Sequence, residues 1–329
     1  MKKVAVVGAG TMGRVHSGAY AKMPNAELVA IMDTLPEAAE KLAEAHSVRA
    51  YSDFKQMLSE LEVDVVDVCV PTNVHLDYIK IAAAAGKHIC AEKPLGRTIG
   101  QAQEAVRVCE EAGVVLFVAQ VLRWFPDFKR LRDLIESGAI GTPVVARTTR
   151  ASSFPRGTND WFADMKASGG VALDMIIHDF DWLRWTFGKV KRIYARGLYD
   201  AGIPLTDYAL VTLRFESGVV AHVEGNWARP SGFSTEVEVA GTEGLLHFAS
   251  DQAVPLRIEL KADAEAGPGV NVPSSPTSVD PYYQELEHFI TCLEEGRTPD
   301  VTGQDGLEAV RIAESALRSI SSGQPVALA

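Results

Sequence analysis

The sequence predicts two domains: an N-terminal α/β domain with a doubly wound parallel sheet, and an α+β C-terminal domain with a large, mostly antiparallel open sheet. The chain has 329 residues, which is enough for two separate hydrophobic cores. Residues 1–121 alternate apolar strands with helical segments, whereas residues 192–260 read mainly as consecutive strands joined by short turns. We therefore expect domains at 1–121 and 122–329.

The alternation of strand and helix in the first domain can be followed element by element. Residues that favour helix ends bound several helices, such as Pro36 at the start of one and Gly86 and Gly113 after two others. We expect strands at 3–7, 27–33, 64–70, 87–91 and 114–119, and helices after residue 10 and at 36–46, 74–85 and 98–112. Strands that alternate with helices form parallel sheets with right-handed crossovers.

The pattern changes after Gln120. Turn signals at 216–218 and 241–244 separate apolar strands, which is typical of antiparallel neighbours. We expect strands at 144–150, 205–215, 218–228, 234–240 and 244–249, and helices at 127–137, 170–185, 281–295 and 304–321. Residues 262–278 form an excursion rich in Pro, Gly and Ser.

A glycine motif lies between the first strand and the first helix, with the sequence Gly8-Ala9-Gly10-Thr11-Met12-Gly13. Gly8 permits a tight turn, Gly10 lets the backbone approach a pyrophosphate, and Gly13 lets the helix pack close to the sheet. The N-terminus of the helix supplies unpaired N–H groups to the phosphates. The motif therefore predicts a Rossmann domain that binds a dinucleotide at these residues.

Asp33 ends the second strand, about 20 residues after the motif, where a carboxylate accepts hydrogen bonds from the adenosine ribose hydroxyls. A carboxylate would repel a 2′-phosphate, and Thr34 and Leu35 provide no arginine to bind one. We therefore expect NAD rather than NADP. Asp33 could also be the N-cap of the helix that begins at Pro36.

Polar residues follow three of the predicted parallel strands at their carboxyl ends, where such sheets bind ligands. They are Thr72, Asn73 and His75 after one strand, Glu92 and Lys93 after the next, and Gln120 with Arg123 and Trp124 after the last. We expect the cofactor to contact most of this set. The first three also stand at a helix start, where they could be capping residues, and Lys93 could be an ordinary surface lysine.

A second group of polar residues lies in the predicted helix 170–185. Asp174 and His178 are four residues apart, so a helix places them on one face, and Asp181 shares that face. An aspartate beside a histidine orients the imidazole and raises its basicity, which suits a general base. A polar helix face, or a buried histidine with a satisfied partner, would give the same spacing. We expect no metal, because further ligands at zinc-like spacing are missing.

Composition excludes several classes of partner. The formal net charge is −11, from 32 basic and 43 acidic residues, which disfavours nucleic acid and anionic membranes. No apolar run reaches the length of a transmembrane helix, and the first residues lack the apolar core of a signal peptide. The four cysteines show no metal-ligand spacing. We expect a protein of the reducing cytoplasm.

Taken together, these motifs resemble the Gfo/Idh/MocA oxidoreductases over essentially the whole chain. The resemblance rests on the glycine motif, on Glu92-Lys93-Pro94, and on a Gly-Gly-x-x-x-Asp-x-x-x-His-x-x-Asp segment that begins at Gly169. Residues 174–181 and Leu122-Arg123 are most similar to the inositol 2-dehydrogenase branch. The chain departs from the family pattern at Ser168 and Phe162, which bears on the substrate more than on the chemistry.

The resemblance implies roles for the matching residues. Lys93 would bind the reacting hydroxyl and the nicotinamide ribose, His178 would be the general base, and Asp174 would be its partner on the substrate. The polyol site would be lined by Arg123, Asn159 and Asp160 and walled by Trp161, Trp227 and Phe233.

Three functions fit these expectations. The first is an NAD-dependent dehydrogenase that oxidises a hydroxyl of a cyclic polyol or sugar, such as an inositol. The second is an enzyme that retains NAD and uses transient oxidation to cleave a glycosidic bond. The third is a non-catalytic NAD or sugar sensor, which has no need of Lys93, Asp174 and His178. We also expect a homodimer or homotetramer, because the alternating face of Val219, Ala221 and Val223 would need burial against another subunit.

Overall fold

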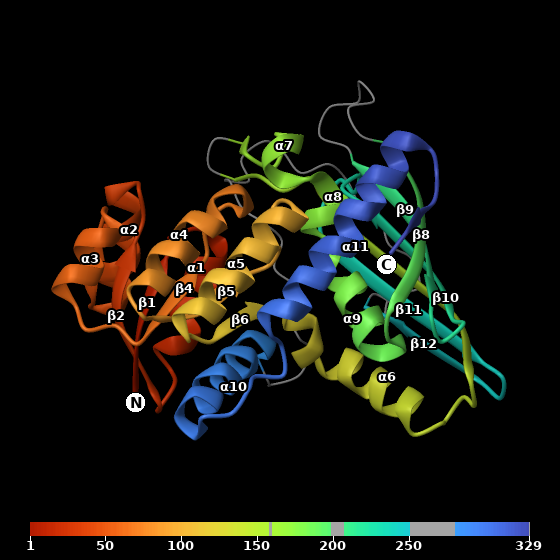
Figure 1. Ribbon diagram of the computed structural model, residues 1–329, viewed down its shortest axis with the longest axis horizontal. Helices are drawn as coiled ribbons and strands as arrows, with labels where there is room; N and C mark the ends of the chain where they lie inside the picture. Colours follow the sequence, from red (N-terminus) through yellow and green to blue (C-terminus); the bar gives the residue numbers. More distant parts are fainter. Residues whose placement is uncertain (158–159, 199–206, 251–279, 329) are drawn as a thin grey trace. The chain divides into compact units, whose positions relative to one another are not determined.

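The structure is a computed structural model that describes residues 1–157, 160–198, 207–250 and 280–328 (Figure 1). The chain forms two compact units. The N-terminal unit contains Met1–Trp124 together with the part of the C-terminal segment that ends at Val310. The C-terminal unit starts at Phe125 and also contains the chain from Arg311 onward.

The N-terminal unit therefore includes a helix from the end of the chain. Helix α10 (Pro281–Glu295) packs against α1 (Thr11–Tyr20) and the short 3-10 segment η2 (Val121–Trp124). Phe289 of α10 stacks on Phe117 with ring centroids 5.0 Å apart. The domain boundary expected after residue 121 divides the chain by sequence order alone. In the structure, α10 comes from the C-terminal part of the chain and packs in the core of the N-terminal unit.

The sheet of the N-terminal unit has six parallel strands in the order β3-β2-β1-β4-β5-β6, which is the order of a doubly wound Rossmann sheet. The strands are β1 (Lys2–Val7), β2 (Ala26–Met32), β3 (Arg49–Tyr51), β4 (Val65–Val68), β5 (His88–Glu92) and β6 (Leu116–Ala119). All side chains of β4 and β6 are buried, as in sheets covered on both faces. The predicted fold class is confirmed.

The helices of this unit largely follow the predicted pattern. They are α1, α2 (Pro36–His46), α3 (Phe54–Glu60), η1 (Thr72–Val74), α4 (His75–Ala84) and α5 (Ile99–Ala112). Helix α2 has the predicted bounds. Strand β3 and helix α3 were not expected, because three and seven residues are too short to show a clear periodicity.

The sheet of the C-terminal unit has seven strands in the order β12-β11-β7-β10-β9-β8-β13. They are β7 (Pro143–Ser152), β8 (Val190–Leu198), β9 (Tyr208–Phe215), β10 (Val220–Asn226), β11 (Phe233–Gly241), β12 (Leu245–Ala249) and β13 (Val326–Ala327). Only the described pair of β7 and β10 is parallel, so the predicted mostly antiparallel sheet is confirmed. The predicted excursion at 262–278 lies outside the described residues.

The helices of the C-terminal unit are α6 (Pro126–Glu136), α7 (Met165–Ser168), α8 (Gly170–Asp174) and α9 (Ile177–Phe187), and α11 (Gly303–Ser322) is divided between the units at Val310. The single helix expected at 170–185 is wrong, since the chain breaks it at Met175 and Ile176. The Ile176 amide bonds to the carbonyl of Val171, five residues back. The break lets Ile176 pack closely against Gly225 of β10. A Cβ added at Gly225 would lie 2.4 Å from Cγ2 of Ile176.

The prediction that Val219, Ala221 and Val223 form an apolar face of this sheet left open for another subunit is also wrong. Val219, Ala221 and Val223 are buried within the chain, where α8 and α9 pack on β10. Alternation identifies an apolar face of a strand, but it does not tell whether the chain itself covers that face. The opposite face carries exposed apolar side chains, including Leu198 and Leu210. In the part of the chain that is described, no helix is long and apolar enough to cross a membrane.

Candidate active-site residues

The glycine turn between β1 and α1 has the geometry of a phosphate-binding loop. Gly8 has a φ of 104°, and a Cβ there would lie 2.3 Å from the Cys69 carbonyl oxygen. A Cβ on Gly13 would lie 1.8 Å from the Gly8 carbonyl oxygen, so only glycine lets the helix approach the turn this closely. Gly10 is exposed and faces open space at the N-cap of α1.

Asp33 lies at the end of β2 and is tied to the glycine turn. Its Oδ2 accepts a hydrogen bond from the Ala9 amide at 2.7 Å, and its Oδ1 accepts one from the Leu35 amide at 2.9 Å. The N-cap of α2 is Leu35, so the alternative that Asp33 is the N-cap is wrong. The carboxylate is half-buried and connects two loops that the sequence assigns to one nucleotide.

The loop after β4 contains Thr72, Asn73 and His75. Thr72 and His75 are buried, and Asn73 is exposed. The ring Nε2 of His75 lies 2.8 Å from the Val70 carbonyl oxygen, and burial lowers the pKa of this imidazole. His75 is therefore a neutral side chain that fixes the loop. Neither Thr72 nor His75 caps a helix through a hydrogen bond of its side chain.

Glu92 and Lys93 follow at the end of β5. Glu92 is 7% exposed, and its Oε2 accepts a hydrogen bond from the Lys93 amide at 3.0 Å. Lys93 is half-buried, and the peptide bond to Pro94 is cis. The hydrogen bond from the Lys93 amide to Glu92 fixes the backbone at this strand end, and the role of the lysine stays a prediction.

The end of β6 supplies Gln120 and η2 supplies Arg123. Gln120 is fully buried, and neither polar atom of its amide has a hydrogen-bond partner among the described residues. The Arg123 guanidinium is 5% exposed and lies 3.0 Å from the Asp300 carbonyl oxygen and 3.3 Å from the Asp305 carboxylate. These contacts explain why Arg123 is buried, and its role in substrate binding stays a prediction.

The residues present in the N-terminal unit fit a dinucleotide. The open space at Gly10 and the helix N-terminus behind it suit a pyrophosphate, with Thr11 and Met12 in the first turn of α1. That first turn contains no acidic residue, and the unpartnered amide of Gln120 is available to a ligand. Polar groups buried without partners are rare in folded proteins, so a polar group of a bound dinucleotide would fit as a hydrogen-bond partner of the Gln120 amide.

The C-terminal unit carries the second predicted set on two helices instead of one. Asp174 ends α8 and His178 lies in the first turn of α9, and both are half-buried. Asp181 is fully buried. Asp179, the residue after His178, forms an ion pair with Arg150 of β7. The Nε of Arg150 lies 2.6 Å from Oδ2 of Asp179, and its Nη2 lies 3.3 Å from Oδ1. This ion pair fixes the turn of α9 that carries His178.

An aromatic group surrounds the predicted substrate loop of this unit. Trp161 and Phe162 have ring centroids 4.0 Å apart, and Phe162 lies edge-on to Trp227. Phe233 packs on the guanidinium of Arg150. A hollow of about 280 Å³ is lined by Phe154, Pro155, Arg156, Asp160 and Ala163. The predicted residue Asn159 lies outside the described residues.

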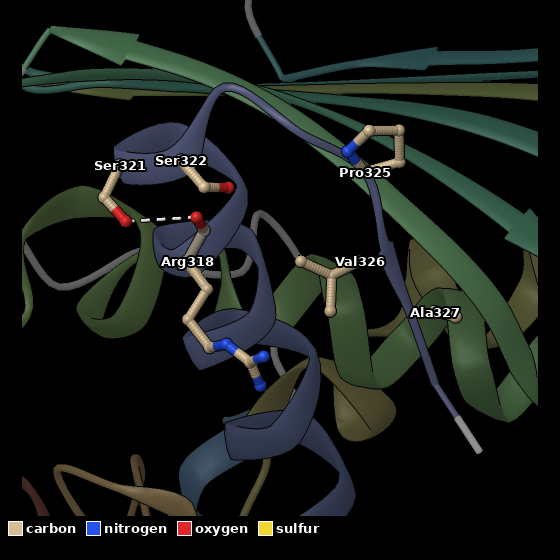
Figure 2. A pocket seen from close by; sticks show the side chains of 6 residues that line it. All are labelled: Arg318, Ser321, Ser322, Pro325, Val326 and Ala327. Carbon is tan, nitrogen blue, oxygen red and sulfur yellow. Dashed lines mark hydrogen bonds between the residues drawn. The ribbon is translucent and has the colours of Figure 1, made fainter.

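A larger hollow, of about 420 Å³, lies at the end of α11 and beside β13 (Figure 2). Its lining residues are Arg318, Ser321, Ser322, Pro325, Val326 and Ala327. None of these is a predicted site residue, and none of them has a carboxylate or imidazole group. Size alone therefore does not identify the functional site of this chain.

Sequence reasoning missed a buried cluster below the glycine turn. His16 of α1 contacts Asp67 of β4 and Glu92 of β5, and the thiol of Cys69 lies 3.4 Å from the His16 ring. His16 and Asp67 are 51 residues apart in the chain. The one available signal was an aspartate in the middle of an otherwise apolar buried strand, which needs a partner.

The N-terminal unit has a parallel sheet with a glycine turn at its centre. The C-terminal unit has a mixed sheet, and the helices that cover it carry a histidine and acidic residues. This combination is typical of a class of nucleotide-dependent oxidoreductases. Comparison with protein families makes this specific. Residues 2–120 match the family described as "Oxidoreductase family, NAD-binding Rossmann fold", and residues 128–247 match the "GFO/IDH/MocA C-terminal domain". The chain belongs to the Gfo/Idh/MocA family of oxidoreductases and is a dehydrogenase with an NAD-type cofactor.

Individual relatives cover nearly the whole chain. It is 32% identical over 331 residues to the uncharacterized oxidoreductase YrbE of Bacillus subtilis, covering 98% of this chain and 95% of that protein. It is 30% identical over 333 residues to a myo-inositol 2-dehydrogenase of Thermotoga maritima, covering 99% and 98%. The crystal structure of GenD2 from gentamicin A biosynthesis in complex with NAD matches with a TM-score of 0.88 at 27% identity, covering 100% and 96%.

Proposed function

We propose that the protein oxidises a secondary hydroxyl of a cyclic polyol or sugar, of the inositol kind, to a ketone with NAD⁺ as hydride acceptor. The observation that carries the proposal is the combination of the glycine turn with Lys93, Asp174 and His178 in one chain of this family. The myo-inositol 2-dehydrogenase among its relatives supports the substrate class.

The protein must remove a proton from the hydroxyl and stabilise the charge that develops on the oxygen. An imidazole accepts a proton near neutral pH, so His178 is the proposed base, with Asp174 as its partner on the substrate. The ammonium group of Lys93 stabilises the alkoxide-like oxygen. Membership of the family is the reason to propose that Lys93 of the N-terminal unit and Asp174 and His178 of the C-terminal unit act on one substrate. The nicotinamide, when bound, supplies the hydride acceptor.

We assign cofactor contacts to the glycine turn, Asp33 and the strand-end residues Thr72, Asn73, His75, Glu92 and Gln120. Asp33 supports NAD over NADP, because a carboxylate repels a 2′-phosphate and the neighbouring residues 34 and 35 are uncharged. Among the predicted substrate-binding residues, Asp160 and Trp161 have the strongest support, since Asp160 lines a hollow and Trp161 belongs to the aromatic group beside it. Carboxylates such as Asp160 and Asp174 can discriminate a polyol from a simple alcohol.

We further propose a homo-oligomer in a reducing cytoplasm. The exposed side chains of Leu198 and Leu210, 51% and 40% accessible, support an interface on the outer face of the C-terminal sheet. The four cysteines are free, which supports a reducing compartment. Light scattering that shows a monomer would contradict the first part.

The test is to mix the purified protein with NAD⁺ or NADP⁺ and a panel of inositols and sugars, and to follow reduced nicotinamide by absorbance. We expect NADH from at least one cyclic polyol, and a rate loss of about 1,000-fold or more in both Lys93→Ala and His178→Ala. If the protein binds NADH but oxidises no substrate of the panel, the proposed dehydrogenase activity is rejected. It would then favour an enzyme that retains its NAD, or a sensor.

A further inference from the structure

Three buried charged side chains form a continuous contact below the glycine turn. The Nδ1 of His16 lies 2.8 Å from Oδ2 of Asp67, and its Nε2 lies 3.1 Å from Oε1 of Glu92. His16 and Asp67 have no exposed surface, and Glu92 is 7% exposed. We call His16, Asp67 and Glu92 the buried triad.

The buried triad joins three segments that the proposed function uses. His16 lies on α1, three residues after Gly13 of the glycine turn. Asp67 lies on β4, opposite Cys90 of β5 in the sheet register, and β4 leads into the loop of Thr72. Glu92 is the last residue of β5 and precedes Lys93.

The charges of this arrangement fit a histidine cation between two carboxylates. Burial lowers the pKa of the His16 imidazole, but the adjacent Asp67 carboxylate and the Cys69 side chain together raise this pKa well above its usual value. Burial raises the pKa of the neighbouring thiols of Cys69 and Cys90, which are therefore neutral. Buried ions cost several kcal/mol each to desolvate, and an apolar set of the same volume is often as stable. Stability therefore does not explain why this site is charged.

Glu92 connects the buried triad to Lys93. One carboxylate oxygen of Glu92 faces His16, and the other accepts the hydrogen bond from the Lys93 amide at 3.0 Å. The chain of contacts therefore runs from Asp67 through His16 and Glu92 to the backbone of Lys93. Rotation of the Glu92 carboxylate would break one contact or the other.

We propose that His16 and Asp67 are positioning residues for Lys93, which fix the Glu92 carboxylate and thereby hold the lysine turn at a defined place relative to the glycine turn. The inference rests on the proposed function of Lys93. The purpose of the triad is then geometric, because a displacement of about 1 Å in a reacting group can lower a rate about 100-fold.

A metal site is the other use that such a cluster could have. His16, Asp67 and Cys90 offer ligand atoms within 4.8 Å of one another. A metal needs a lone pair on an imidazole nitrogen, however, and both ring nitrogens of His16 face carboxylates. The contacts therefore favour a positioning cation over a ligand.

The first test compares His16→Gln with Cys109→Ala, a buried control on α5 of the same unit. Glutamine can bond only one of the two carboxylates. We expect His16→Gln to lower kcat about 100-fold and to change the Kd for NADH by less than about threefold. Cys109→Ala should leave both unchanged. Asp67→Asn, which keeps an acceptor for the His16 ring, should retain more kcat than Asp67→Leu.

The second test asks whether His16 acts through Lys93. In a Lys93→Ala background, single-turnover rates should fall by less than about twofold when His16→Gln is added, because residues that act as a unit are not additive. An equal loss from His16→Gln in both backgrounds would overturn the proposal, since it would show an effect independent of the lysine.

The third readout needs no substrate. Lysines are labelled by reductive methylation with ¹³C, and the Lys93 signal is identified by its absence in Lys93→Ala. In the NADH-bound protein, the Lys93 signal should shift in His16→Gln and stay in place in Cys109→Ala. An unmoved signal in His16→Gln would overturn the proposal. If the wild type oxidises no polyol, the proposed function fails, and this readout still decides the role of the triad.

Discussion

The two units hold their proposed catalytic residues in comparable ways, with one chemical difference. In the N-terminal unit, Glu92 precedes Lys93 and is held by His16. In the C-terminal unit, Asp179 follows His178 and is held by Arg150. In both units, a buried acid next to the proposed catalytic residue contacts a buried basic side chain from another element.

The difference lies in the cation. A guanidinium is always charged and binds a carboxylate through two parallel hydrogen bonds, whereas an imidazole can lose its proton. The guanidinium cation therefore does not depend on loss of a proton, whereas the charge of the His16 ring does. The side chains that form the two anchors are all buried, with at most 7% of their surface exposed: His16, Glu92, Arg150 and Asp179.

The largest effect is expected from Arg150→Met, which leaves the Asp179 carboxylate buried without its cation. Loss of one partner of a buried ion pair typically costs about 3–5 kcal/mol. We expect the free energy of unfolding in urea to fall by this amount. Arg147→Met is the matched control, because Arg147 lies on the same strand and its contact with Glu238 is exposed, where a pair contributes about 0–1 kcal/mol.

The double variant Arg150→Met/Asp179→Leu sharpens this prediction. It should recover most of the lost stability, since replacing both partners removes the unpaired charge. Equal losses in Arg150→Met and Arg147→Met would remove the basis for treating the buried pair as an anchor.

Sequence patterns predicted those elements whose ends carry local signals. Helices α2 and α10 begin at a proline in the predicted place, and α10 is followed by Gly296, which adopts the left-handed conformation. The break between α8 and α9 escaped prediction because its cause lies elsewhere in the chain. Ile176 leaves the helical path to pack on Gly225, and a pattern of apolar residues along one segment contains no information about that neighbour.

The candidate site divides in the same manner. The glycine turn and Asp33 could be located from their spacing along the chain, which is set by the nucleotide that such turns bind, and Lys93 could be located because it follows a predicted parallel strand at its carboxyl end. The anchors were not predictable, because His16 and Asp67 are 51 residues apart, and Arg150 and Asp179 are 29 apart. Their partners follow from the register of strands and the packing of helices. Sequence indicates that a buried aspartate needs a partner, and only the fold identifies it.

A second prediction compares how closely each unit packs its backbone. Gly13→Ala places a Cβ 1.8 Å from a carbonyl oxygen, whereas Gly225→Ala places one 2.4 Å from the side chain of Ile176. Overpacking costs about 1–3 kcal/mol, and a side chain yields more easily than backbone, so Gly13→Ala should be the more destabilising. Thermal unfolding measures both. Calorimetric titration should show loss of NADH binding in Gly13→Ala alone, and equal binding in the two variants would contradict the role of the turn.

The smallest effect expected is a pH dependence that only the His16 anchor should show. Because the folded-state pKa of His16 is raised well above 6.5, its usual value, the folded protein keeps a proton that the unfolded chain releases. This stabilisation is complete below pH 6.5 and is lost as the pH rises through the folded-state pKa. Hydrogen exchange of the β4 and β5 amides should report a fall of at most about 1.4 kcal/mol between pH 7 and 8.

Two comparisons isolate this effect from other titrating groups. His16→Gln shares every other ionisable side chain with the wild type, so its β4 and β5 amides should show a flatter dependence on pH. His75 has the opposite sign, because burial lowers its pKa, and its contribution to stability is lost when the pH falls below 6.5. Parallel pH profiles for the wild type and His16→Gln above pH 7 would mean that His16 is neutral in the folded protein. A neutral imidazole has one N–H and can donate to only one of the two carboxylates, so this result would contradict the cationic His16 anchor and the parallel with Arg150.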